Sequence, residues 1–307
     1  MWQYTLRRLL VSIMVAFTVS VITFTLLRMA GDPAVALAGE GASMADIERI
    51  RIEYNLDRPA VEAYWDWVTK ALQGNFGRSF NLNADVSQLI AERLPVTFYL
   101  SSLALLVALM LSLPLGILAG LKPNSLIDRF ALTLSVVGQA MPTFWFGLIL
   151  MTYVGLRWGL LPISGNQGFA SYVMPAIVLG YYITPVLLRL TRAGIIDALS
   201  SDYIRTARAK GIGTSGVIFR HALRNAMIPV VSLSAVQFGF LLGGSIIVES
   251  VFSINGIGLL AWQAIQRSDF DVMQAVVLVA SAVYILLTFL ADMLNAILNP
   301  RLRTGLQ

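Results

Sequence analysis

The chain has 307 residues, of which 57% are hydrophobic and only 13% are charged, and its net charge is +5 at neutral pH. Soluble globular domains typically contain about 45–50% apolar and about 25% charged residues, so charges this sparse cannot cover a surface exposed to water. The composition therefore excludes a soluble enzyme, a disordered chain and a nucleic-acid-binding protein. With no cysteine and a single histidine, His221, the chain also lacks a disulfide framework, a thiol nucleophile and a multi-histidine metal site. These features indicate an all-α polytopic membrane protein.

Six charge-free stretches predict six transmembrane helices, since a helix needs about 20 apolar residues to cross the hydrocarbon core. They are 9–27, 94–121, 130–156, 158–188, 225–248 and 272–291. The fourth stretch starts with a polar segment, so its helix is expected to begin near Val173. A further uncharged stretch, 250–266, contains Asn255 and Gln263 and is predicted to be an interfacial or re-entrant segment.

The first stretch has two interpretations. With Ala36-Leu37-Ala38 after it, it resembles a signal peptide followed by a cleavage site. Its apolar run is longer than the roughly 7–15 residues of a signal peptide, and the small residues lie well beyond its end. An uncleaved first transmembrane helix within residues 1–28 is therefore favoured.

The loops between the stretches predict the orientation, because lysine and arginine gather in cytoplasmic loops. Most basic residues outside the long first loop lie on the same side as the N-terminus, and the short loops on the other side contribute only Arg157 and Arg267. Both termini are therefore predicted to be cytoplasmic. The basic charge is a topology signal and does not require nucleic acid.

The first external loop, 29–93, is long enough to form a subdomain. Ser43 and Asp46 predict the start of a short helix over 43–54, and apolar spacing predicts a second helix over 60–72, followed by a turn at 74–77. Two roles remain open: a small cap that packs on the external helix ends, or a docking surface or lid for something that arrives from outside.

The cytoplasmic loop at about 194–227 is predicted to hold two short helices. Ser200 or Ser201 is a candidate N-cap of the first, and Gly211 supplies the stop expected just past its end. After a glycine-rich bend, the second carries Arg220 and Arg224 on one face. A basic loop that only enforces topology needs no capped helix, so the pattern favours a rigid element presented to a soluble cytoplasmic partner.

The sequence contains no established catalytic motif. The chain has no G-x-S-x-G elbow, no H-E-x-x-H pair and no P-loop. Asp292 is the only clearly intramembrane ionisable residue, and Asn295 on the same face predicts an interhelical hydrogen bond there. Glu249 is expected to be solvated or paired at the outer interface. A chain that moves solute with so little chemistry is either a channel or a subunit that takes energy from a partner.

The segment 141–145 is a candidate for the translocation path. Pro142, Phe144 and Trp145 would line it if a proline kink opens an internal passage. A kinked helix that serves only packing is an equally good interpretation.

The cytoplasmic loop carries a family resemblance. Arg205-Thr206-Ala207, three residues and then Gly211 resemble the Glu-Ala-Ala-x3-Gly loop of bacterial ABC importer permeases, although Arg205 replaces the glutamate. The fuller pattern, with His221-Ala222-Leu223-Arg224, is similar to the dipeptide/oligopeptide/nickel subfamily. Further segments resemble the same subfamily, with Asn255 where proline is expected: Leu56-Asp57-Arg58-Pro59, Gly74-Asn75-Phe76-Gly77-Arg78-Ser79, Arg93-Leu94-Pro95-Val96-Thr97 and Glu249-Ser250-Val251-Phe252-Ser253-Ile254-Asn255-Gly256-Ile257-Gly258.

This resemblance implies the type I ABC importer permease fold, with a transmembrane core at 94–307, in a bacterial cytoplasmic (inner) membrane. The long first loop suggests the first of two permease subunits. The implied partners are a second homologous permease, two ATPase subunits that hold ATP and magnesium, and an extracytoplasmic solute-binding protein; this chain itself would hold no cofactor. The residues implied in coupling to the ATPases are Asp202, Arg205, Ala207, Arg208, Gly211 and His221.

The implied solutes are di- and oligopeptides, with nickel, glutathione and opine-like compounds as alternatives. Two other classes remain as rivals: a stand-alone channel, which should function without ATPase subunits, and a membrane enzyme, whose activity should depend on Asp292 or His221.

Overall fold

The computed structural model describes residues 2–39, 41–53, 57–79 and 81–298. The N-terminal elements are α1 (Trp2–Ala30), α2 (Pro33–Ala38), α3 (Met44–Glu53), α4 (Ala60–Leu72), β1 (Arg78–Ser79) and β2 (Ala84–Asp85). The middle of the chain forms α5 (Val86–Leu121), α6 (Leu126–Ala140), α7 (Thr143–Leu150), the π-helical η1 (Met151–Arg157) and α8 (Ala170–Ser200). The last elements are α9 (Asp202–Ala209), α10 (Thr214–Gly216), the π-helical η2 (Val217–Ala222), α11 (Leu223–Gly244), α12 (Ile246–Phe252), α13 (Ile257–Gln266) and α14 (Phe270–Leu298).

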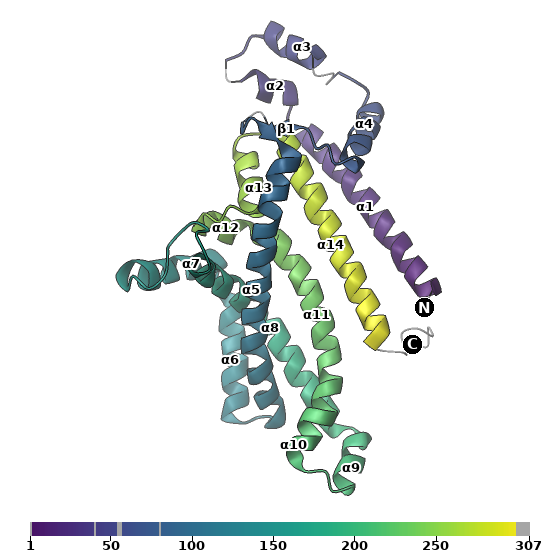
Figure 1. The fold of residues 1–307 in the computed structure, drawn as a ribbon, viewed down its shortest axis with the longest axis vertical. Coiled ribbons are helices and arrows are strands. Elements are labelled where there is room, and N and C mark those ends of the chain that lie inside the picture. The colour runs from purple at the N-terminus through teal and green to yellow at the C-terminus, as the bar shows by residue number, and fades with distance from the viewer. Residues whose placement is uncertain (1, 40, 54–56, 80, 299–307) are drawn as a thin grey trace.

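Long helices run along the length of the molecule, with α2–α4 at one end and α9–α10 at the other (Figure 1). Within the described residues, five helices are long and apolar enough to cross a membrane: those that contain 5–29, 86–121, 170–200, 214–243 and 270–296. They account for five of the six predicted spans, and α8 begins at Ala170, close to the expected start at Val173.

The third predicted span, 130–156, is not one straight helix. It breaks after Ala140, and the α6 segment meets the α7–η1 segment at 100°. Met141, the residue before Pro142, is extended (φ −85°, ψ 120°). This conformation is expected, because a proline disfavours the helical conformation of the residue before it. The count of six spans stays a prediction, since it depends on whether this bent pair crosses the membrane.

The segment predicted as interfacial or re-entrant, 250–266, is also bent. The helices α12 and α13 meet at 87°, and Ser253 between them has a positive φ of 51°. This geometry agrees with a segment that turns back rather than crossing straight through.

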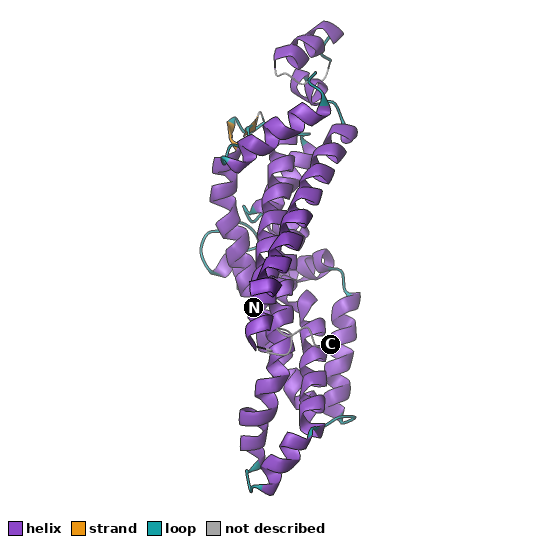
Figure 2. Ribbon diagram, turned by 90° about the vertical axis from the view of Figure 1, so that its right-hand side faces the viewer, coloured by secondary structure: helices purple, strands orange, loops and turns teal. Residues whose placement is uncertain are grey.

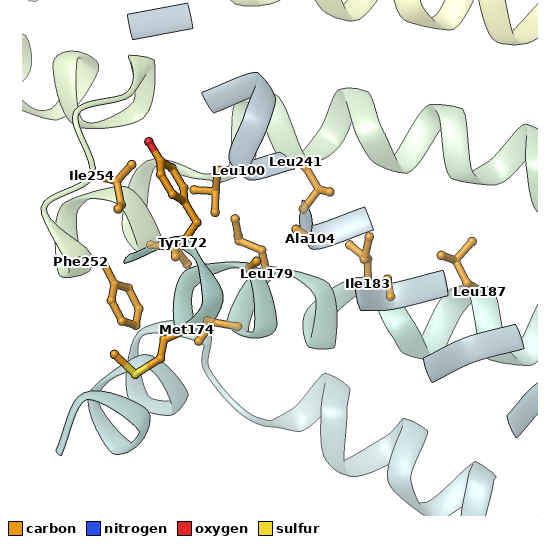
Figure 3. Close-up of a cluster of buried hydrophobic side chains, with 14 of the residues drawn as sticks. Leu100, Ala104, Tyr172, Met174, Leu179, Ile183, Leu187, Leu241, Phe252 and Ile254 are labelled. Carbon is orange, nitrogen blue, oxygen red and sulfur yellow. The ribbon is translucent and has the colours of Figure 1, made fainter. Parts of the chain in front are cut away.

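The core lies where α5, α8, α11 and α12 meet (Figure 3). Its fully buried side chains include Leu100, Ile183, Leu187, Leu241 and Phe252. The helices α5 and α8 approach each other so closely that a Cβ on Gly180 would lie 2.6 Å from the Ala104 carbonyl oxygen. Small residues permit such contact between membrane helices.

Polar contacts join the outer helices α1, α11 and α14. Asp292 of α14 forms an ion pair with Arg8 of α1, with 2.9 Å between Nη1 and Oδ2, and Asn295 is hydrogen-bonded to Ser232 of α11. The polar link expected here is therefore present, and it joins α14 to both neighbours.

The first loop, predicted to be external, packs against α1 and the start of α14. Tyr64 of α4 is hydrogen-bonded to Ser20 of α1 over 2.7 Å, and its ring meets Phe24 edge-on at 5.4 Å between centroids. The β1–β2 ribbon, orange in Figure 2, is tied to the turn before α14 because Ser79 Oγ donates to Asp269 over 2.6 Å. The predicted helix over 43–54 corresponds to α3 (Met44–Glu53), and its last predicted residue, Tyr54, lies outside the described residues. A docking role for this loop stays a prediction.

Candidate functional site: the α9–η2 end and the cleft between α6, α8 and α11

The loop predicted to be cytoplasmic folds into α9, α10 and η2, which continue directly from α8. Ser201 ends α8 in an extended conformation, and its hydroxyl donates back to the Ala198 carbonyl, as the Ser200 hydroxyl does to Asp197. Ser201 occupies the N-cap position of α9, as the sequence predicts, but neither serine side chain makes a capping hydrogen bond. The turn between α8 and α9 instead uses both hydroxyls on the end of α8.

The inner face of α9 is apolar and buried. Ile204 and Ala207 pack with Ala198 of α8 and with Val217 and Ala222 of η2. Ala207, predicted as a coupling residue, thus lies in this small core, where its contribution would be to hold α9 in place.

Gly211 ends α9 in a Schellman motif. Its φ is +79°; its N–H donates to the Arg208 carbonyl over 3.0 Å, and the Ile212 N–H donates to the Ala207 carbonyl over 3.2 Å. Ile212 then packs on the small core beneath α9, the hydrophobic contact that usually accompanies this motif. The space around Gly211 is open, so the backbone conformation alone requires glycine here.

The outer face of α9 is charged and exposed. Asp202 and Arg205 form a loose pair at 3.4 Å, with side chains 94% and 80% exposed, and Arg208 is exposed beside them. On η2, His221 is half-buried and Arg220 is exposed. We call the exposed Asp202, Arg205, Arg208 and Arg220, together with His221, the α9–η2 surface. It is a mostly cationic surface on a rigid support, suited to contact another macromolecule.

A partly buried ion pair, in which Asp128 is buried and Arg192 is 23% exposed, braces α8 above this surface. Arg192 of α8 makes two contacts with Asp128 of α6, at 2.5 and 2.8 Å, and Asp128 is only 2% exposed. Asp128 also accepts from the Asn124 N–H over 2.8 Å. The pair therefore fixes the turn between α5 and α6 to the part of α8 that leads into α9.

The residues predicted for the translocation path lie at the bend between α6 and α7. Pro142, Phe144 and Trp145 are all exposed there, and their role in transport stays a prediction. A cleft of about 260 Å³ lies elsewhere, between α6, α8 and α11. It is lined by Gln139, Tyr182, Val186, Gln237 and Phe240. The signal for it in the sequence was the presence of glutamines inside charge-free stretches.

Glu249 occupies a different environment from the one expected. It is fully buried and accepts hydrogen bonds from Thr97 Oγ1 (2.7 Å), Ser245 Oγ (2.8 Å) and the Leu259 N–H (3.0 Å). Solvation at the outer interface is therefore wrong. The carboxyl instead joins the first turns of α5 to the bend between α12 and α13.

A helical membrane chain with a rigid charged element at one end and a cleft between its long helices has the features expected of the membrane subunit of a transporter. Residues 112–304 match the family described as "Binding-protein-dependent transport system inner membrane component", and residues 1–101 match the corresponding N-terminal family. The chain therefore belongs to this family of bacterial ABC importer permeases, which are multi-pass proteins of the inner membrane.

Relatives extend over the whole chain. The glutathione transport system permease protein GsiC of Escherichia coli K12 is 39% identical over 304 residues, 99% of each chain. GsiC of Shigella dysenteriae serotype 1 matches with the same values: 39% identity over 304 residues and 99% of each chain.

Solved structures share the fold. The inward-facing MetNI methionine ABC transporter aligns with a TM-score of 0.59 and 16% identity, over 69% of this chain and 97% of that one. An amino acid ABC transporter solved with histidines aligns with a TM-score of 0.52 and 18% identity, over 70% of this chain and 94% of that one.

Proposed function

We propose that this permease subunit imports peptide-type solutes, a class that includes the tripeptide glutathione, and that ATPase subunits act on it through the α9–η2 surface. The observation that carries the solute class is the full-length similarity to glutathione transport permeases. Nickel and opine-like solutes lack this support, because the similar GsiC proteins of Escherichia coli and Shigella dysenteriae are glutathione transport permeases.

The assembly follows from the family. A binding-protein-dependent permease receives its solute from an extracytoplasmic binding protein, and this chain supplies no nucleotide-binding loop of its own. We infer a complex with a second permease, two ATPase subunits that hold ATP and magnesium, and the binding protein. This chain's part is to form the passage and to transmit the motion of the ATPases.

The geometry of α9 supports transmission by a rigid element. Its buried face is fixed on α8 and η2, and its charged face is exposed. When the ATPases close on ATP, a displacement of α9 would be passed to α8, since the two helices are separated by Ser201 alone. A stand-alone channel works without ATPase subunits, so it would not require a rigid helix that transmits their motion.

Gly211→Val tests the coupling role. A β-branched residue at positive φ is strained, and a left-handed residue other than glycine costs about 1–2 kcal/mol, so the Schellman motif should open and release Ile212 from the small core. We expect ATP hydrolysis stimulated by the solute-loaded binding protein to fall to its basal level, while membrane insertion is retained. The measurement is ATPase activity of the reconstituted complex, with a thiol-free analogue of glutathione as solute.

Gly213→Val is the matched control. Gly213 lies in the same loop with open space around it, but its φ is −63°, which valine adopts without strain. Stimulation should survive in this variant. Equal loss in both variants, or normal stimulation in Gly211→Val, would remove the coupling assignment.

A further inference from the structure

The cleft between α6, α8 and α11 combines groups that do not suit contact with lipid. Gln139 and Gln237 come from the charge-free stretches of two different helices, and both line the same cleft. An amide that faces hydrocarbon without partners costs several kcal/mol. Two amides that converge on one opening therefore indicate a face that meets water, solute or protein.

One amide of the cleft is available for binding. Among the described residues Gln237 has no hydrogen-bond partner, so its side chain offers two N–H donors and one acceptor to the cleft. Gln139 is different, because its Oε1 accepts from Arg189 Nη1 over 3.0 Å.

Arg189 places a positive charge beside the cleft, because its Nη1 donates to the lining residue Gln139 over 3.0 Å. It follows Tyr182 and Val186 at helical spacing on the same face of α8, and its Nη1 also donates to Ser135 Oγ over 3.1 Å. Arg189 therefore holds Gln139 in position. No residue that lines the cleft within the described chain is acidic, so the charge of Arg189 is not cancelled there.

The remaining wall is aromatic. Tyr182 and Phe240 are stacked, with 6.2 Å between ring centroids and 16° between planes. The cleft volume of about 260 Å³ is slightly below the range of roughly 300–1,000 Å³ typical of small-molecule sites, and the exposed rims of Gln139 and Phe240 leave one side open. A second permease subunit packed on this side would complete the enclosure.

We propose that this cleft is a solute subsite within the permease, and that it takes a short peptide-type solute with a free carboxylate directed toward Arg189. The inference rests on the proposed solute class. Amide groups of the solute would bind Gln237, the aromatic pair would cover its apolar part, and the guanidinium would select for the negative charge. Arg189 is thus a positioning and selectivity residue of the passage.

The absence of cysteine from the chain permits a direct test. In the reconstituted complex, Gln237→Cys should react with water-soluble methanethiosulfonate reagents. Val231→Cys is the control on the same helix: Val231 is exposed but lies about 120° around the axis from Gln237, away from the cleft, and it should not react. The anionic reagent should react with Gln237→Cys about fivefold faster than the cationic one, because Arg189 raises the local potential.

Solute protection then tests the subsite itself. The probe is γ-glutamyl-alanyl-glycine, which has no thiol, and its C-terminal amide is the comparison. The free acid should slow labelling of Gln237→Cys and the amide should slow it less. Adding Arg189→Gln should abolish both the difference between probes and the preference for the anionic reagent, whereas Arg189→Lys should keep them.

The outcomes separate this inference from the proposed function. If the probe, loaded on the binding protein, stimulates ATP hydrolysis but does not protect Gln237→Cys, or if that cysteine never reacts, the cleft is an interface with the other permease and the subsite is wrong. If the probe neither stimulates nor protects, the proposed solute class fails and the subsite fails with it.

Discussion

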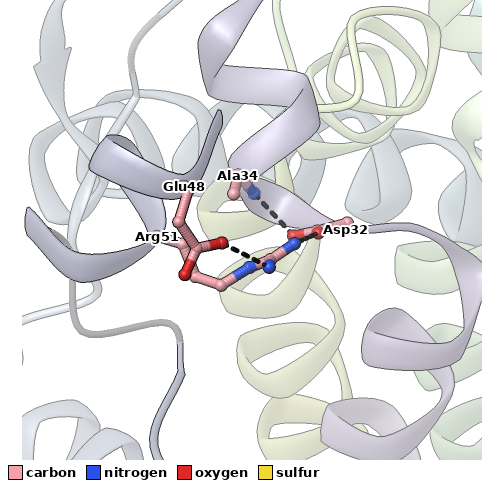
Figure 4. Close-up of polar contacts among 4 residues, drawn as sticks. All are labelled: Asp32, Ala34, Glu48 and Arg51. Carbon is pink, nitrogen blue, oxygen red and sulfur yellow. Dashed lines mark hydrogen bonds and ion pairs between the residues drawn. The ribbon is translucent and has the colours of Figure 1, made fainter. Parts of the chain in front are cut away.

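Asp32 shows how one residue organises the external end of the chain. Its carboxylate caps α2 by accepting from the Ala34 N–H over 2.9 Å, and it pairs with Arg51 of α3, which also contacts Glu48 (Figure 4). Burial alone would raise the pKa of Asp32, but the hydrogen bonds from Arg51 and Ala34 and the charge of Arg51 together lower this pKa below its ordinary value. The residue therefore stabilises the α2–α3 contact in its charged form.

The lowered pKa of Asp32 predicts a pH dependence. A carboxyl of this kind stabilises the folded state fully above its unfolded pKa of about 4, and the contribution is lost as pH falls through the lower, folded value. Hydrogen exchange in α3, corrected for the intrinsic rate, should increase between about pH 6 and about pH 3. Because a partly exposed pair contributes at most about 1 kcal/mol, the effect should stay local.

Asp32→Asn should show the raised exchange already at about pH 6, since the charge is absent throughout. Asp57→Asn, exposed in the same external loop, should behave like the natural chain. An Asp32→Asn variant indistinguishable from the natural chain would contradict the role given to this carboxylate.

Two residues, Glu249 and Gly211, show which environments can be predicted from sequence and which cannot. Glu249 looked like an interfacial charge because it follows an apolar stretch, yet Thr97, from a helix far away in sequence, donates to it. No local pattern reveals such a long-range partner. Gly211 was predictable, in contrast, because the requirement for positive φ is local and appears as glycine after a basic helix end.

At the scale of elements, Asp128 and Arg192 hold α6 against α8. Breaking a buried ion pair by removing one charge destabilises a protein by roughly 3–5 kcal/mol. Asp128→Asn should therefore lower the melting temperature of the purified complex and weaken coupling, because α8 leads directly into α9.

The adjacent Arg129 supplies the control for this pair. It lies on the same helix and is exposed, so Arg129→Gln should leave the melting temperature nearly unchanged. Equal melting temperatures of the two variants would show that the pair does not brace α8.

Elements were predicted well where one local property determines them. Long apolar runs predicted α1, α5, α8, α11 and α14, and the glycine-rich bend predicted the separation of α9 from η2. The break of the third span was missed, because Pro142 is compatible with a kink as well as with a 100° turn, and only packing decides between them. The cleft was missed for the same reason: Gln139 and Gln237 lie far apart in sequence and meet only through helix packing.

At the scale of the molecule, the proposed function assigns different tasks to the two ends of the bundle. The cap formed by α2–α4 and the α9–η2 surface lie at opposite ends (Figure 1), as an importer that receives solute on one side and energy on the other requires. The cleft between α6, α8 and α11 lies on the helices that lead to the α9–η2 surface.

The most direct test of the central claim is photo-crosslinking in the native complex from single cysteines carrying a benzophenone. Arg205→Cys places the probe on the exposed face of α9, and Met44→Cys, at an external residue that is 83% exposed, is the control. The proposed function predicts crosslinks from Arg205→Cys to ATPase subunits, identified by mass spectrometry, and none to them from Met44→Cys. ATPase crosslinks from Met44→Cys, or their absence from Arg205→Cys in a complex that co-purifies with its ATPases, would contradict it.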